Sequence, residues 1–217
     1  DTTQPWYTKM HFITSVKIDD TIVPVSTAYW FNDAINMVGG DFNNLKAEKL
    51  IDMNSMFYDA GSDVNSFKLT GLENWDVSNV TTMRDMFKYA GTNATTWSVK
   101  IPSKTGELTN TTSKWYGSSD SIYAEPPSGK SFTLPLIVDV VVQDGALAAG
   151  ESATKTGWVG QDVTFNIVPN DSSKTGFVSC TNNQTGTFKD NVLTVSNVTS
   201  DTTCTVTYKS ISTVLYN

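Results

Sequence analysis

Histidine, cysteine and charged side chains are scarce in this sequence, and their scarcity excludes several kinds of enzyme. The 217 residues include one histidine and two cysteines, and charged residues make up 17% of the chain. No serine or cysteine lies in a recognisable nucleophile motif, and no glycine-rich phosphate loop is present. The single histidine, His11, stands between two apolar residues and is more simply structural than catalytic. We therefore predict that the chain has no catalytic residues, binds no cofactor and is not an enzyme.

Basic patches and long apolar runs are also missing. The formal net charge is −7, so a nucleic acid would be repelled and is not an expected partner. No apolar run is long enough to span a membrane, and we predict no membrane insertion. Threonine, serine, asparagine and glycine are abundant instead, a composition common in extracellular β-rich proteins. Because the sequence begins with Asp1 rather than methionine, we interpret it as a processed ectodomain whose export and anchoring segments lie outside it.

Carboxylates offer the only candidates for acid chemistry or metal binding. The pair Asp19 and Asp20 fits a turn between short strands better than a glycosidase site. Asp59, Asp63 and Asn65 form an oxygen-rich group that a calcium ion could use. Their spacing lacks the glycine and the terminal glutamate of an EF-hand loop, so polar loop residues are the favoured interpretation. We predict no metal site, with these three residues as the weak calcium candidates.

The most regular feature of the sequence is a unit that occurs twice at a spacing of 30 residues, over Leu45–Leu69 and over Trp75–Val99. Five pairs of positions are identical: Met53/Met83, Met56/Met86, Phe57/Phe87, Ala60/Ala90 and Gly61/Gly91. A shorter third copy lies upstream, where Trp30–Ala34 matches Met56–Ala60. Self-similarity with a period of about 20 to 50 residues is the signature of a stacked repeat array.

Each copy has the apolar spacing of a short amphipathic helix. The positions at i, i+3, i+4 and i+7 are Met53, Met56, Phe57 and Ala60 in the first copy and Met83, Met86, Phe87 and Ala90 in the second. Thr82 is placed to cap the second helix, with Asp85 completing a capping box, and Gly91 fits a left-handed stop. We expect these eight apolar residues to form the repeat core, buried as each strand-and-helix unit stacks on the next.

The second copy carries a family resemblance. It reads WDVSNVTTMRDMF from Trp75 and AGTNATTWS from Ala90, and this pattern resembles the BspA-like leucine-rich surface repeat of bacterial cell-surface proteins. The similarity covers about residues 28–99, and the first copy departs from it with LKAEKLID where the family shows WDVSNVT. The resemblance implies a leucine-rich-repeat-like solenoid, display on a cell surface and no catalytic residues.

The pattern changes to period two from Thr133 onwards. Six or more short strands separated by turn residues predict an all-β sandwich of about 80 residues. The segment resembles the immunoglobulin-like modules of bacterial surface proteins, which usually serve as spacers or stalks. The predicted fold class is therefore α+β, a short solenoid with a β cap followed by an immunoglobulin-like sandwich. The predicted boundaries are a cap over 1–27, a solenoid over 28–116 with units 28–44, 45–74 and 75–104, a linker over 117–132, and a sandwich over 133–217.

Both cysteines fall in the predicted sandwich. Cys180 and Cys204 each lie on a β-prone run, so a disulfide between them is plausible and would suit an oxidising, exported setting. Two buried free thiols are the alternative. A bridge would contribute on the order of 3 kcal/mol by the loop-entropy relation.

Aromatic residues outside the repeat register are the best candidates for ligand contact. Trp75 and Trp97 recur at repeated positions and are expected in the core, whereas Trp115 and Tyr116 follow the last copy. An exposed aromatic face can stack on a sugar ring, so these last two are the ligand-binding candidates, although packing on the open end of the array is the favoured role even for them.

Two functional hypotheses follow from these patterns. The first is a non-enzymatic protein of the bacterial cell surface whose repeats bind a protein or glycan on another surface, with the sandwich as a stalk. The second is a structural subunit of a pilus, filament, or phage tail or capsid, located on a virion in the last cases. The β-prone tail from Ile211 to Asn217 favours the second, because an exposed terminal strand can complete a neighbouring subunit's sheet.

Overall fold

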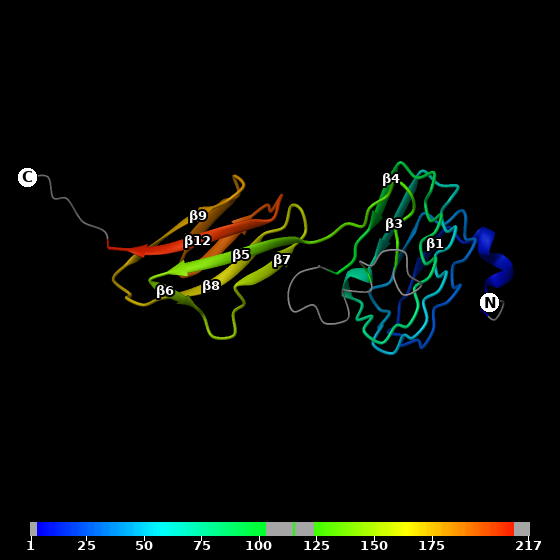
Figure 1. Ribbon diagram of the computed structural model, residues 1–217, viewed down its shortest axis with the longest axis horizontal. Coiled ribbons are helices and arrows are strands. Elements are labelled where there is room, and N and C mark those ends of the chain that lie inside the picture. The colour runs from blue at the N-terminus through cyan, green and yellow to red at the C-terminus, as the bar shows by residue number, and fades with distance from the viewer. Residues whose placement is uncertain (1–3, 103–114, 116–123, 211–217) are drawn as a thin grey trace, which may run out of the picture. The chain divides into compact units, whose positions relative to one another are not determined.

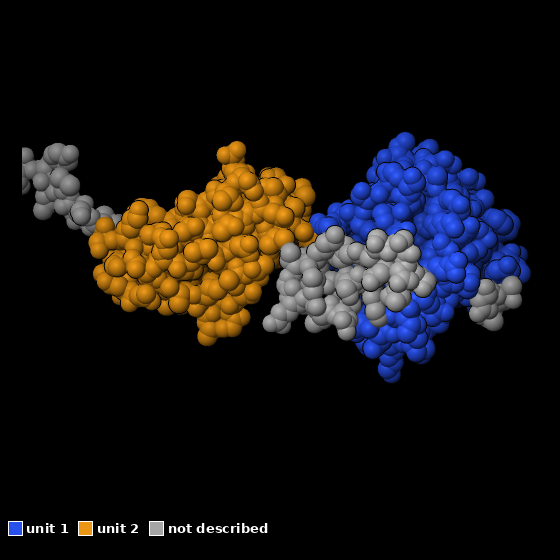
Figure 2. Space-filling model, in the orientation of Figure 1, with its two compact units in different colours: residues 1–134 blue, residues 135–217 orange. Residues whose placement is uncertain are grey.

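The chain divides into two compact units, residues 1–134 and residues 135–217 (Figure 2). The computed structural model describes residues 4–102, 115 and 124–210. The boundary lies between Leu134 and Pro135, immediately before the first strand of the second unit. Each unit has its own buried apolar cluster.

The N-terminal unit is built around a four-stranded parallel sheet in the order β1-β2-β3-β4 (Figure 1). Its elements are the 3-10 helix η1 (Tyr7–Phe12), β1 (Ser15–Lys17), β2 (Gly39–Asp41), β3 (Ser66–Thr70), the 3-10 helix η2 (Leu72–Asn74) and β4 (Thr96–Val99). Strands β3 and β4 pair with Phe67 opposite Trp97. The two sequence copies therefore lie directly on each other, at the 30-residue offset of the sequence.

The predicted α+β fold class, with its helical solenoid, is wrong, because the described residues contain no α-helix. The segments expected to be helical run as turns over residues 54–63 and 84–93. Residues with left-handed backbone interrupt them at every fourth position, at Ser55 and Asp59 in one copy and at Asp85 and Tyr89 in the next. An α-helix cannot contain such residues, because each reverses the hand of the backbone.

Backbone hydrogen bonds show what replaces the helix. The N–H groups of Ser55, Phe57 and Asp59 donate to carbonyls of the next copy, those of Arg84, Met86 and Lys88, at 2.9, 2.9 and 2.8 Å. The N–H groups between them close turns within the copy, as in the 3.1 Å bond from Ala60 N–H to Phe57 O. Alternate N–H groups of residues 55–60 therefore form hydrogen bonds with the next copy. In an α-helix almost all of them would bond to carbonyls of the same helix.

Residues at the predicted helix caps stabilise turns instead of helix ends. The side chain of Asp52 accepts from the N–H of Asn54 at 2.8 Å, and the Thr82 hydroxyl accepts from Arg84 N–H at 3.3 Å. Both bonds span two residues, which is the geometry of side-chain-stabilised turns rather than of helix capping. Gly61 and Gly91 do have left-handed backbone, with φ of +65° and +59°, but they lie within the turns.

An aromatic column forms the centre of this unit. The rings of Phe31, Phe57 and Phe87 stack in sequence, with centroids 5.6 and 5.5 Å apart and interplanar angles of 16° and 10°. The ring of Trp6 extends the column beyond Phe31 at 6.3 Å and 14°. Because Phe31 belongs to the short upstream copy, three copies and one N-terminal residue contribute to a single core.

The N-terminal segment contributes less β-structure than expected. Of the two strands predicted before residue 28, only β1 forms, and the second is reduced to isolated bridges at Ile22 and Ser26. The preceding residues form η1 instead, with Met10 buried against the core.

The C-terminal unit consists of two four-stranded sheets around one core. Its strands are β5 (Leu136–Gln143), β6 (Gly145–Leu147), β7 (Thr154–Gly157), β8 (Val163–Pro169), β9 (Thr175–Cys180), β10 (Thr185–Lys189), β11 (Val192–Ser196) and β12 (Thr202–Lys209). The sheet orders are β10-β11-β8-β6 and β7-β5-β12-β9. Alternate residues of the central strands, such as Phe165 and Ile167 in β8 and Leu193 and Val195 in β11, point into the shared core.

Candidate functional site

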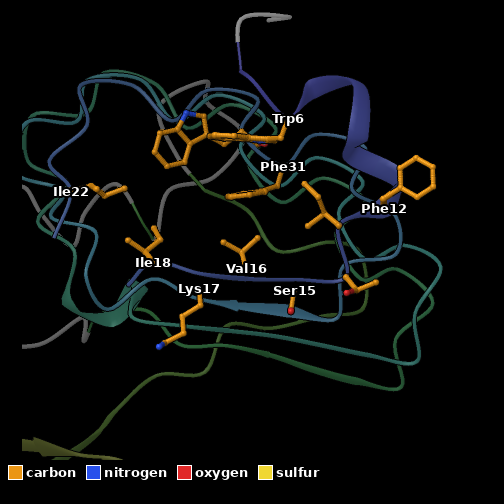
Figure 3. A pocket seen from close by; sticks show the side chains of 11 residues that line it. Trp6, Phe12, Ser15, Val16, Lys17, Ile18, Ile22 and Phe31 are labelled. Atoms are coloured by element: carbon orange, nitrogen blue, oxygen red, sulfur yellow. The ribbon is translucent and has the colours of Figure 1, made fainter. Parts of the chain in front are cut away.

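A hollow of about 500 Å³ lies at the β1 end of the N-terminal unit (Figure 3). Trp6 and Phe31 form one wall, and Val16, Ile18 and Ile22 form the opposite wall. The stack of copies ends here: η1 and Trp6 cover the column of rings, but no further copy among the described residues covers the apolar side chains of β1. We define this hollow and the neighbouring edge of β1 as the β1-end site.

The backbone of β1 lines the same hollow. Strand β1 has β2 as its only strand neighbour within the described residues. Thr14 O accepts from Val38 N–H at 2.8 Å, and Ile18 N–H donates to Asp41 O at 3.1 Å. Because backbone groups of a strand alternate in direction, those of Ser15 and Lys17 point away from β2. Four backbone donors and acceptors therefore face the open edge of the sheet.

The rim of the β1-end site carries exposed aromatic and charged groups. Phe12 is 77% exposed although it is a large apolar residue, and Lys9 Nζ lies 5.9 Å from its ring centroid. On the other side, Lys17 Nζ and Asp19 Oδ1 form a 2.6 Å ion pair, and this bond raises the pKa of Lys17. The site therefore has an apolar floor, with an exposed aromatic ring beside the Lys9 cation on one side and the Lys17–Asp19 ion pair on the other.

The opposite end of the unit is closed. Phe132 packs against Phe87 and Trp97, with ring centroids 5.4 and 5.7 Å away. Thr133 pairs with the edge of β4, since its N–H donates to Val99 O at 2.9 Å and its carbonyl accepts from Ile101 N–H at 3.2 Å. The two ends therefore differ: one offers a hollow and an open strand, and the other is covered by the chain.

Trp115 belongs to this closed end. Its side chain is 1% exposed and lies edge-on to Phe132, with ring centroids 6.4 Å apart. Trp115 therefore has the other expected role, packing on the end of the array, and its buried ring offers no face to a ligand, because it supplies the apolar cover that the last copy needs. Tyr116, the other predicted ligand-binding residue, lies outside the described residues.

The weak calcium candidates Asp59, Asp63 and Asn65 lie at and just after the turns of the first copy. Among the described residues, no group of three or more histidine, cysteine, aspartate or glutamate side chains is arranged to hold a metal ion. Burial, together with the charges of Asp33 and Asp63, raises the pKa of Asp59, and a hydrogen bond with Ser62 opposes the increase. Asn65 uses its carbonyl to bind the next copy, accepting from Thr95 N–H at 2.9 Å. These residues serve the stacking of the copies.

The other predicted positions have structural roles. The eight repeat-core residues, Met53, Met56, Phe57, Ala60, Met83, Met86, Phe87 and Ala90, are all fully buried. Cys180 and Cys204 lie opposite each other in the antiparallel pair of β9 and β12, and they form a disulfide. Neither set contributes to a site that faces solvent.

Sequence reasoning missed the β1-end site. Val16, Ile18 and Ile22 stood out only as β-prone residues, and Trp6 was not selected. The available signal was the spacing of Val16 and Ile18, which places both side chains on one face of a strand. Nothing in the sequence showed that this face would lack a cover.

Part of the chain is similar to one protein family. Residues 25–117 match the model of a family described as "Mycoplasma protein of unknown function, DUF285", a match that spans less than half of the chain. No curated protein and no solved structure matches the chain. The matched range coincides with the repeats. It leaves most of the β1-end site, including β1 itself, outside.

No helix among the described residues has the length and apolar character needed to cross a membrane.

Proposed function

We propose that this chain is a non-enzymatic binding protein of a bacterial cell surface, whose N-terminal unit binds a protein partner at the β1-end site. The C-terminal unit serves as a spacer. The observation that carries the proposal is the hollow of about 500 Å³ beside an edge of β1 that pairs with no other strand of the described residues. The resemblance of the repeats to BspA-like surface repeats and the acidic, threonine-rich composition support the extracellular location.

The chemistry of the site favours a protein over a glycan. Sugar-binding sites combine aromatic faces with several hydrogen-bonding side chains, whereas the walls here are formed by aliphatic and aromatic groups. The edge of β1 adds the outward-facing backbone N–H and C=O groups of Ser15 and Lys17, which are the partners of another polypeptide. Exposed apolar surface that is rimmed by polar residues is typical of protein interaction sites.

A binding panel tests this proposal. The immobilised full chain is exposed to fibronectin, fibrinogen, collagen and a glycan array, and each response is compared with that of two variants. Phe12→Ser removes the exposed aromatic of the rim, and Val159→Ser removes a similarly exposed apolar residue of the C-terminal unit; the two are 77% and 68% exposed. We expect binding to at least one protein, weakened about fivefold or more by Phe12→Ser and unchanged by Val159→Ser, in keeping with an aromatic contact of about 1 kcal/mol or more. Binding to glycans alone, or to nothing in the panel, would overturn it.

A second candidate function is a structural subunit that assembles by strand addition. The open edge of β1 favours it, because such an edge can receive the terminal strand of a neighbouring subunit. The predicted donor, residues 211–217, lies outside the described residues. Light scattering after size-exclusion chromatography separates the two functions. Filaments or oligomers that disappear when the chain ends at Ser210 support the subunit, and monomers near 23.7 kDa support the surface binding protein.

A further inference from the structure

We propose that the β1-end site binds an extended polypeptide segment that adds a strand beside β1 and inserts apolar side chains from alternate positions into the hollow. This inference rests on the proposed function and defines the chemistry of its partner. The partner segment needs three features: an extended backbone, apolar residues at i and i+2, and no proline at the paired positions.

The first feature follows from the edge of β1. Thr14 and Ile18 bond to the chain of β2, so the backbone groups of Ser15 and Lys17 point away from β2, and both residues line the hollow. A neighbouring strand satisfies both residues at once, because groups two residues apart on one strand meet groups two residues apart on the next. A small apolar molecule could fill the hollow but would leave these donors and acceptors unpaired.

The second feature follows from the volume and direction of the hollow. Val16 and Ile18 point into it from one face of the chain, toward Phe31 (Figure 3). A cavity of about 150 Å³ accommodates a benzene ring, so a volume of about 500 Å³ has room for two or three large apolar side chains. An added strand places its alternate side chains about 6.6 Å apart on the same face, which matches side chains at i and i+2.

A symmetric pairing with the same end of a second copy is not the favoured occupant. Such a pairing would place two hollows opposite each other, and Phe12, the exposed aromatic at each rim, is a single side chain that is too small to fill a volume of about 500 Å³. Empty apolar volume costs free energy in proportion to its size. The occupant must therefore be convex and extended, which a strand with large side chains is.

The edge also provides a sharp test, because proline at position 15 removes only an outward-facing N–H. Ser15→Pro removes a hydrogen-bond donor that an added strand would need. The bonds from Val38 N–H to Thr14 O and from Ile18 N–H to Asp41 O, which hold β1 to β2, are left in place. Ser15→Ala keeps the N–H and is the matched control. Lys17→Pro is a second blocking variant in case the first disturbs folding, and circular dichroism and thermal unfolding verify the fold of each.

The probe is a phage-displayed library of short random peptides selected on the full chain. An enriched peptide is then synthesised, and its Kd is measured calorimetrically against the parent chain and the three variants. We expect enriched sequences with apolar residues at alternate positions. We also expect affinity weakened about tenfold or more by either proline variant and within about twofold for Ser15→Ala. Enriched sequences that resemble residues 211–217 would support the same pairing with a neighbouring copy as donor.

Three results would overturn the inference: no enrichment, enriched peptides without the alternation, or peptides that bind folded proline variants as well as the parent chain. The failure of the inference is distinguishable from failure of the proposed function. If binding of a matrix protein is weakened by Phe12→Ser but not by Ser15→Pro, the proposed binding function stands and the addition of a partner strand beside β1 is rejected. Loss of all binding in both experiments would reject both.

Discussion

At the scale of single residues, Gly61 holds a backbone conformation that allows the two copies to stack. Its φ is +65°, and a Cβ there would collide with the ring of Phe67 and lie 2.5 Å from the carbonyl oxygen of Met37. Gly129 is also left-handed, with φ of +77°, but a Cβ at that position would meet open space. Comparing alanine substitutions at Gly61 and Gly129 therefore separates two losses of folding free energy: the loss from a left-handed backbone and the additional loss from the steric collision.

Alanine at these two positions should give different losses of stability. Gly129→Ala should lower the free energy of unfolding by about 1–2 kcal/mol through the left-handed conformation alone. Gly61→Ala adds overpacking of about 1–3 kcal/mol, so its total loss should be about 2–5 kcal/mol. Tryptophan fluorescence in urea reports mainly on this unit, because Trp158 is the one tryptophan after residue 134. Equal losses for the two variants would show that the packing around Gly61 is not as described.

Asp59 gives a prediction about pH. Burial and the carboxylates of Asp33 and Asp63 raise its pKa above the ordinary value of 3.8, so folding disfavours the ionised form. The charged carboxylate therefore lowers stability at neutral pH, and the loss is recovered as the pH falls through the raised pKa and below 3.8. Asp59→Asn should increase the urea midpoint of unfolding at neutral pH and leave it nearly unchanged at about pH 3. A decrease at neutral pH would contradict the sign of this shift.

The sequence predicted correctly which residues of the repeats are buried, but it did not predict their backbone conformation. All eight apolar repeat positions are buried, because an i, i+3, i+4, i+7 pattern marks one face in either a helix or a series of turns. The pattern cannot distinguish the two structures. The distinction depends on left-handed backbone at Ser55, Asp59, Asp85 and Tyr89, and serine and tyrosine carry no strong preference for that conformation. The helix prediction failed for this reason.

At the scale of elements, the disulfide fixes the pairing of β9 and β12. Cys180 and Cys204 close a loop with a sequence separation of 24 residues. The loop-entropy relation gives a contribution of about 3 kcal/mol to the stability of the C-terminal unit. The aromatic core of the N-terminal unit includes neither cysteine. The effect of the disulfide should therefore be confined to the C-terminal unit.

Reduction, or replacement of both cysteines by serine, should destabilise only the C-terminal unit. Scanning calorimetry should show its transition moving to lower temperature, while the transition followed by tryptophan fluorescence keeps its midpoint. Gly61→Ala is the reciprocal control, since it should move the fluorescence transition alone. A shift of both transitions by removal of the disulfide would contradict the separation of the two cores.

At the scale of the whole molecule, the N-terminal unit has one closed end and one open end. The stacking of the copies followed from their self-similarity, with Phe57 and Phe87 in contact as their equivalent positions imply. Which end stays open did not follow from the repeats. Packing of Trp115 on an end of the array was expected from its place after the last copy, but the packing of Trp6 and Phe132, which also lie outside the repeated positions, is visible only in three dimensions. The candidate site could not be predicted for the same reason.

The most direct test of this account is amide hydrogen exchange along β1, measured by NMR on the full chain with and without a peptide selected as described above. The Ile18 N–H donates to Asp41 O and should exchange slowly in both samples, whereas the Ser15 and Lys17 N–H groups should exchange rapidly in the free chain. Addition of the peptide should slow the hydrogen exchange of the Ser15 and Lys17 N–H groups specifically. Slow exchange at Ser15 and Lys17 in the free chain, or no change on adding the peptide, would contradict an open strand edge that receives a partner.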